Sequence, residues 1–218
     1  MAVLIGRDRE IARLRGFLAA CEDGPCALTI DGEAGIGKTA LLDAAIADAS
    51  GVCVLRVRCV DTESGLAYVG VADLLGERAG TATAALPPPQ RRALEIALLR
   101  ADPAGELVEP HAVGRAVLGV LRLLTVRAPV LIAIDDAQWL DAASPDALAF
   151  ALRRLDGVRL GLLATWRAAD SRLPLRLDEV MPSTRWHRLA IGPLHQTSSG
   201  SCWISDFLAR RGGPSGRG

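Results

Sequence analysis

The residues with the clearest chemical pattern form a glycine-rich stretch near the start of the chain. Residues 32–39 match the phosphate-binding pattern G-x-x-x-x-G-K-[ST]. Glycines let backbone N–H groups curl around phosphates, Lys38 supplies a positive charge, and the Thr39 hydroxyl can ligate Mg²⁺. The sequence therefore predicts a nucleoside triphosphate site. The expected binding residues are Gly32, Glu33, Ala34, Gly35, Ile36, Gly37, Lys38 and Thr39.

The sequence on either side of this stretch supports the prediction. Residues 26–30 are typical of a buried strand, and residues 38–49 carry apolar side chains at helical spacing until Gly51 ends the helix. A helix N-terminus aimed at the loop would add its partial positive charge to the phosphate site. A chance match in a glycine-rich chain is the alternative, and the strand–loop–helix context disfavours it.

A second chemical feature is a pair of carboxylates about a hundred residues further on. Residues 130–134 are apolar without alternation, which is typical of a strand covered on both faces, and they end in Asp135 and Asp136. Ligands of open α/β sheets bind beyond the carboxyl ends of strands, so we expect the pair to meet the phosphate loop. Asp135 would then hold Mg²⁺, and Asp136 would orient or deprotonate the attacking water. The alternative is that an aspartate here only caps a turn.

A cation is expected on the same rim. Arg167 follows an apolar strand at residues 160–165, and a positive charge there can sense the terminal phosphate. The alternative is an ordinary exposed arginine. The predicted catalytic residues are thus Lys38, Asp136 and Arg167, and the predicted Mg²⁺ ligands are Thr39 and Asp135.

Strands and helices alternate along the chain, which favours an α/β fold. Residues 52–59 alternate in polarity, as expected of an edge strand. We expect a three-layer α/β phosphate-loop NTPase with a mostly parallel five-stranded sheet. Asp8 and Ser144 are the expected N-caps of two helices. Helices are expected at residues 9–20, 38–49, 66–75 and 90–99 and from 110 and 144; strands at 26–30, 52–59, 130–134, 160–165 and 186–191.

The composition excludes several classes of protein. The chain has 25 basic and 25 acidic residues, so no nucleic-acid or membrane surface is indicated. Its apolar runs are too short to cross a bilayer and its start lacks a signal peptide, so a cytoplasmic location is expected. The five cysteines show no C-x-x-C spacing, so neither a zinc site nor a disulfide framework is indicated.

Several motifs together resemble one known family. They are residues 4–10 (Leu-Ile-Gly-Arg-Asp-Arg-Glu), the loop at 32–39, the run at 132–141, the triplet at 165–167 and the segment at 189–194. In this order they resemble the STAND class of AAA-related signalling ATPases, which has an origin-recognition-complex-like AAA ATPase domain. In particular, they resemble the amino-terminal domain of large ATP-binding LuxR-type transcriptional regulators. The acidic pair followed by Gln-Trp-Leu-Asp is the most specific part.

The resemblance implies further roles. Gly6 and Arg7 would lie near the adenine, and Pro193 would lie beside the base. Lys38 and Thr39 would serve phosphate and Mg²⁺, with ATP and Mg²⁺ as the cofactors. Asp135 and Asp136 would be the metal-linked and water-activating acids, and Arg167 would contact the γ-phosphate. For Trp139 we favour a packed aromatic side chain.

The domain organisation is expected to be simple. Residues 1–194 would form the NTPase domain, and residues 195–218 a polar Gly/Ser-rich tail that resembles the product of a truncation or frame change. The helical lid, sensor repeats and helix-turn-helix of the family cannot fit in these residues, so no DNA-binding element is expected. The expected partners are ATP and ADP, with self-association or a protein partner also open, and no membrane.

These observations predict a nucleotide switch that hydrolyses ATP slowly with Mg²⁺. Three alternatives remain open. A small-molecule kinase would use the same loop, although no acceptor-specific motif is present. An ABC-type transporter subunit is disfavoured because no LSGGQ-like signature precedes Asp135. A truncated fragment could also retain nucleotide affinity without hydrolysis.

Overall fold

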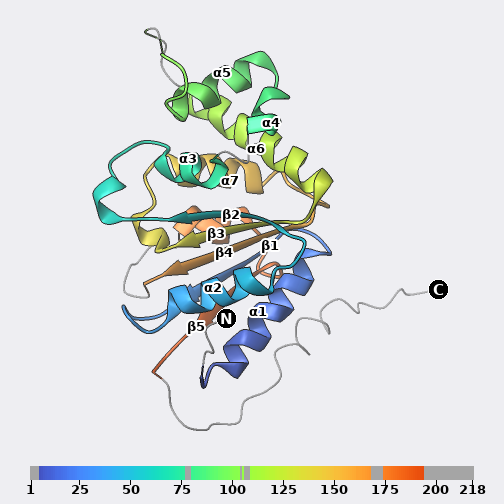
Figure 1. Cartoon of the computed structure of the whole chain (residues 1–218), viewed down its shortest axis with the longest axis vertical. Coiled ribbons are helices and arrows are strands. Elements are labelled where there is room, and N and C mark those ends of the chain that lie inside the picture. The colour runs from blue at the N-terminus through green and yellow to red at the C-terminus, as the bar shows by residue number, and fades with distance from the viewer. Residues whose placement is uncertain (1–4, 77–79, 104, 106–108, 168–173, 194–218) are drawn as a thin grey trace, which may run out of the picture.

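Five parallel strands form the centre of the molecule (Figure 1). The computed structural model describes residues 5–76, 80–103, 105, 109–167 and 174–193, so the predicted tail at 195–218 lies outside the described residues. The sheet order is β2-β3-β4-β1-β5, and every pairing in it is parallel. The strands are β1 Cys26–Asp31, β2 Cys53–Arg58, β3 Val130–Asp135, β4 Leu160–Trp166 and β5 Trp186–Ala190. The predicted α/β fold is confirmed.

Burial along the strands follows their position in the sheet. Every residue of β1, β3 and β4 is buried, because these strands are covered on both faces. In β2 the exposed Arg56 and Arg58 alternate with the buried Leu55 and Val57. β2 lies at the edge of the sheet, as its alternation predicted.

Two helices cover one face of the sheet (Figure 1). They are α1 Asp8–Cys21 and α2 Lys38–Asp48. Their buried side chains, among them Phe17 and Leu42, share one core cluster with alternate residues of the central strands such as Ile30 and Ala133. This core fixes α2, and therefore the loop that precedes it, against β3 and β4.

The opposite face is covered by α3 Val69–Leu75, α6 Pro110–Arg127 and α7 Ser144–Leu152. These helices pack on the other set of strand side chains, such as Ile132 and Ile134. The sheet thus has helices on both faces, which is the expected three-layer architecture. The short turns and helices between them are η1 Asp61–Glu63, η3 Ala137–Trp139, η4 Pro174–Arg176 and α8 Leu177–Val180.

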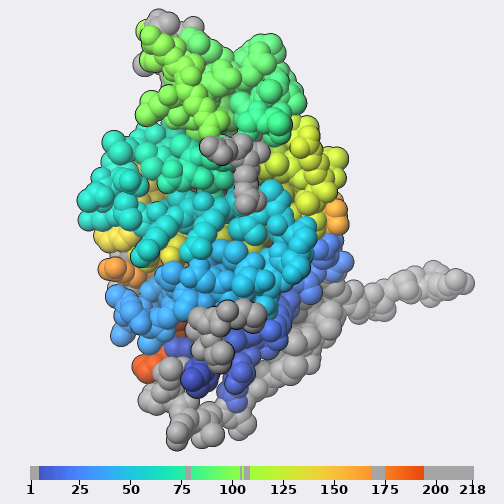
Figure 2. All heavy atoms as spheres, viewed as in Figure 1, coloured from blue at the N-terminus to red at the C-terminus, as the bar shows by residue number. Residues whose placement is uncertain are grey.

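Two further helices extend this second layer away from the sheet. α4 Gly80–Ala84 and α5 Pro88–Ala97 pack against α6 and form the bulge at the top of Figure 2. The predicted helix at 90–99 thus begins and ends two residues earlier, because prolines fit the first turn of a helix. α4 was not predicted.

Both predicted N-caps are wrong. The N-cap residue of α1 is Arg7, and Asp8 is the first helical residue. In α7, Ser144 is also already helical, and its hydroxyl accepts a hydrogen bond from the backbone N–H of Val71 instead. Among the described residues, no helix combines the length and apolar character that crossing a bilayer requires.

Candidate functional site

The strand order brings the two predicted chemical motifs to one edge of the sheet. β4 lies between β1 and β3, and all three strands are parallel. The loop after β1 and the acidic pair at the end of β3 therefore lie at the same edge, on either side of the end of β4. Segments almost a hundred residues apart in the chain can act on one ligand.

The backbone of the glycine-rich loop requires its glycines. Gly35 and Gly37 have φ values of 75° and 103°, in the region that residues with a side chain rarely adopt. At Gly32, a Cβ atom would lie 2.8 Å from both the backbone oxygen and the Cγ1 atom of Ile191. The loop thus turns tightly into α2 and leaves its N–H groups at the helix N-terminus, where anions bind.

Lys38 lies folded over this loop. Its Nζ atom donates hydrogen bonds to the backbone oxygens of Gly32 at 2.9 Å and Glu33 at 2.8 Å. Burial lowers the pKa of the Lys38 ammonium, and the nearby Arg167 charge lowers it further, whereas Asp136 and Asp135 raise it. A phosphate bound beside the Lys38 ammonium would therefore add negative charge that stabilises it.

Asp135 links the acidic pair to the loop. Its Oδ1 atom accepts hydrogen bonds from the Thr39 hydroxyl at 3.1 Å and the Thr165 hydroxyl at 2.6 Å. The side chain is fully buried, and Oδ2 has no hydrogen-bond partner within the described part of the chain. A buried carboxylate oxygen beside a threonine hydroxyl suits Mg²⁺, which prefers oxygen ligands. Thr39 and Asp135 therefore fit the metal role expected of them.

Asp136 adopts an unusual backbone conformation for a residue with a side chain, with φ 54° and ψ 50°. Its backbone N–H donates to the Thr165 hydroxyl at 2.8 Å, and its Oδ1 accepts from the Gln138 amide at 3.0 Å. Hydrogen bonds thus hold both the backbone and the side chain of Asp136. Sequence reasoning assigned no role to Thr165 or Gln138, although both lie inside motifs that it singled out.

Arg167 and Trp139 lie next to each other beyond the strand ends. The Arg167 guanidinium carbon is 5.8 Å from the centre of the Trp139 ring. Trp139 is half-buried and packs against the core, in line with the expected packed aromatic. Arg167 is exposed, and its charge lowers the pKa of Lys38.

The three residues expected near the base are Gly6, Arg7 and Pro193, and Arg7 contacts the loop directly. The buried Arg7 guanidinium donates to the backbone oxygens of Ile36 at 3.1 Å and Gly192 at 2.9 Å. It also pairs with Glu10 at 2.7 Å. Gly6, with φ 75°, precedes it, and the exposed Pro193 follows Gly192. Arg7 thus ties the phosphate loop to the segment after β5, a role that its position in the sequence did not suggest.

A family model and one solved structure are similar to this chain. The family model described as "AAA ATPase domain" matches residues 3–164, which is more than half of the chain. One similar solved chain, from Drosophila ORC bound to DNA, is 21% identical with a TM-score of 0.49, and the match covers 86% of this chain and 43% of that one. This chain therefore spans less than half the length of that ORC chain. Comparison with curated proteins gave no match.

Proposed function

The chain belongs to the AAA ATPase domain family, and from this premise we propose that it binds ATP with Mg²⁺ and hydrolyses the γ-phosphate bond slowly. The observation that carries the proposal is the hydrogen bond between Thr39 and Asp135. It joins the phosphate loop to the acidic pair, so one ligand can contact both. Membership of the family supports nucleotide binding, and the site residues support the metal.

The proposed mechanism rests on positioning and charge. The N–H groups of the loop and Lys38 bind the phosphates, and Arg167 adds a second cation from the end of β4. Thr39 and Asp135 would hold Mg²⁺, which would supply positive charge to neutralise the phosphates. Asp136 accepts a proton from, or orients, the water that attacks in line. By the family resemblance, Gly6, Arg7 and Pro193 would border the adenine.

We further propose that the domain is the nucleotide switch of a signalling or transcriptional regulator of the STAND, LuxR-type class. The support is the resemblance of its motifs, above all the run at 132–141. In this proposal residues 1–194 form the ATPase domain and residues 195–218 a polar tail. We propose that the domain acts in the cytoplasm and does not itself bind DNA. Its partners would be ATP, ADP and either a second copy or another protein.

Nucleotide titration with a thermal stability readout tests the proposal. A ligand that binds the native state alone raises stability in proportion to ln(1 + [L]/Kd), so ATP should raise the melting temperature more with Mg²⁺ than without it. Lys38→Ala should abolish this shift. Asp136→Asn should keep the shift and lose phosphate release. Equal ATP affinity in wild type and Lys38→Ala would refute the assignment.

The same experiment separates the alternatives. A fragment that only binds nucleotide would show the thermal shift without phosphate release at any time. A small-molecule kinase would form ADP only when an acceptor substrate is added, whereas the switch forms ADP from ATP and water alone. Phosphate release in buffer, absent in Asp136→Asn, supports the switch.

A further inference from the structure

A buried carboxylate outside the phosphate site has an unusual set of partners. Asp141 lies at the end of the motif Gln-Trp-Leu-Asp, is 3% exposed, and accepts hydrogen bonds from four backbone N–H groups. Those of Tyr68 and Gly70 belong to the start of α3, and those of Ala143 and Ser144 to the start of α7. These four backbone donors stabilise the buried charge, and Asp141 supplies the cap of α7 that Ser144 does not.

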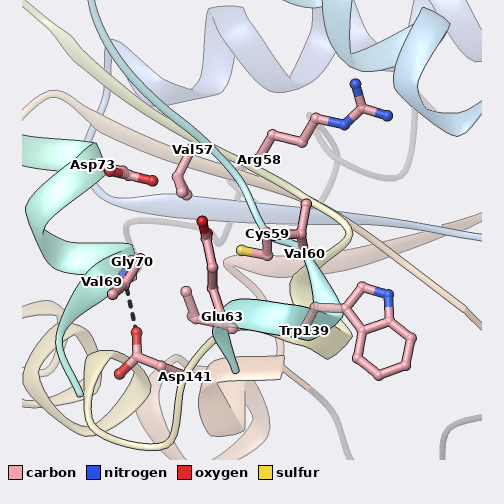
Figure 3. Close-up of a pocket in the computed structure, with 11 residues that line it drawn as sticks. Val57, Arg58, Cys59, Val60, Glu63, Val69, Gly70, Asp73, Trp139 and Asp141 are labelled. Atoms are coloured by element: carbon pink, nitrogen blue, oxygen red, sulfur yellow. Dashed lines mark hydrogen bonds between the residues drawn. The ribbon is translucent and has the colours of Figure 1, made fainter. Parts of the chain in front are cut away.

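The contact between these segments is close (Figure 3). A Cβ atom on Gly70 would overlap the Leu140 side chain and lie 3.2 Å from both the Asp141 Oδ2 and the Ser144 Oγ atoms. The pocket beside it, which Val57, Cys59 and Trp139 help to line, offers about 10 Å³, roughly the space of one water. The hydrogen bonds of Asp141 thus hold the two segments together.

The segment that Asp141 anchors begins at the acidic pair. Between them the chain makes one 3₁₀ turn, in which the Trp139 N–H donates to the Asp136 oxygen at 2.9 Å and the Leu140 N–H to the Ala137 oxygen at 3.2 Å. The Thr165 hydroxyl fixes the near end of this turn. Asp141 fixes its far end. A strained residue such as Asp136 keeps its conformation only when both flanks are held.

We propose that Asp141 is a positioning residue for ATP hydrolysis, which ties the turn after β3 to the start of α3 and thereby holds Asp136 and Gln138 in place. This inference rests on the proposed function. A displacement of α3 would then move Asp141 and so disturb Asp136, the proposed water-activating acid. Asp141 itself contacts no substrate, because its carboxylate is occupied by Tyr68, Gly70, Ala143 and Ser144.

Substitution of Asp141 by asparagine tests the proposal. The amide has one acceptor oxygen, and its NH₂ group would face backbone donors, so the turn should loosen while the phosphate loop stays intact. We expect kcat to fall between about ten- and a hundredfold, as for a small misplacement of a catalytic group, with ATP·Mg²⁺ affinity within about twofold. Asp146→Asn, the same change at an exposed site in the first turn of α7, should leave both unchanged.

A purely structural role predicts a different result. Stability, ATP affinity and kcat would then fall together in Asp141→Asn, and this outcome, or an unchanged kcat, overturns the proposal. Gly70→Ala provides a second route if Asp141→Asn does not fold, because its methyl group presses on Leu140 and crowds the Asp141 carboxylate without removing it. It should lower kcat in the same selective way.

Hydrogen exchange keeps this test separate from that of the proposed function. In Asp141→Asn the backbone amides of Trp139 and Leu140 should exchange faster together with those of Tyr68 and Gly70, whereas those of β1 should not change. If wild type releases no phosphate from ATP, the proposed function fails and amide exchange alone decides whether Asp141 holds the turn. Unchanged exchange at Trp139 and Leu140 would overturn the inference.

Discussion

The hydroxyl of Thr165 donates a 2.6 Å hydrogen bond to Oδ1 of Asp135. The same hydroxyl accepts a hydrogen bond from the backbone N–H of Asp136. One side chain of β4 thus sets the position of both acids of the proposed site, and the strand order places it between them and the phosphate loop. Movement of β4 and movement of the acidic pair are coupled through this residue.

Replacement of Thr165 by valine should impair hydrolysis more than binding. Valine has the same shape but leaves the Asp136 N–H without its acceptor, at a cost of about 1–3 kcal/mol of unfolding free energy. We expect a lower melting temperature and loss of most phosphate release, with ATP binding retained. Thr165→Ser keeps the hydroxyl and should retain most of the activity. Full phosphate release by Thr165→Val would contradict this role of the hydroxyl.

Arg7→Ala should destabilise the phosphate loop. The substitution removes the donor to the backbone oxygens of Ile36 and Gly192 and breaks the ion pair with Glu10. In this pair the Arg7 side chain is 8% exposed and the Glu10 side chain 18%. Hydrogen bonds from a charged group contribute about 1.5–3 kcal/mol each, so chemical denaturation should show a loss of that order. ATP affinity should fall as well. Arg7→Lys is the matched control, because it keeps the charge but has no planar fork and should recover only part of the loss. Wild-type stability in Arg7→Ala would show that these contacts do not hold the loop.

Lys38 is the only lysine in the 218 residues, so its titration can be followed without overlap. Burial lowers its pKa below 10.5 in the ligand-free protein, so the folded state holds this proton less tightly than the unfolded chain. The unfolding free energy should therefore rise with pH between the folded pKa and 10.5. Phosphates should reverse the shift, because negative charge favours the ammonium.

NMR of protein labelled only at lysine measures this directly. The titration midpoint should lie below 10.5 without nucleotide and should rise when ATP·Mg²⁺ is added. A midpoint that ATP·Mg²⁺ does not change would mean that no phosphate reaches Lys38. Lys38→Arg serves as the control. It should lose the lysine NMR signal, and because arginine stays charged, its ATP affinity should not fall at alkaline pH.

Much of the fold and the site was predictable from local patterns. The phosphate loop, the buried strand before the acidic pair and the edge strand at 52–59 each carry a pattern that depends on near neighbours in the chain. The two N-caps and the role of Arg7 were not predictable, because their partners lie far along the chain: the Ser144 hydroxyl binds Val71, and Arg7 binds Ile36 and Gly192. Asp141 shows the same limit, since two of its four donors, Tyr68 and Gly70, lie at the start of α3, 73 and 71 residues earlier in the chain.

The described cysteines should differ in reactivity. Burial, reinforced by the charges of Asp141, Asp135, Asp136 and Asp73, raises the pKa of the Cys59 thiol to about 12. The hydrogen bond with Cys26, followed by burial, raises the pKa of Cys21. Because the thiolate is the reactive form, iodoacetamide at pH 8 should modify the half-buried Cys53 before either. Peptide mass spectrometry of native and denatured protein checks this order, and rapid alkylation of native Cys59 would contradict it.

The segment after β5 runs directly against the nucleotide loop. Ile191 donates its N–H to the Asp31 oxygen at 2.8 Å and fills the space that a side chain on Gly32 would need, and Gly192 is held by Arg7. A chain that continues from Pro193 therefore starts directly beside the nucleotide loop. A force applied to the chain at Pro193 would therefore act directly on the nucleotide loop, without passing through the core.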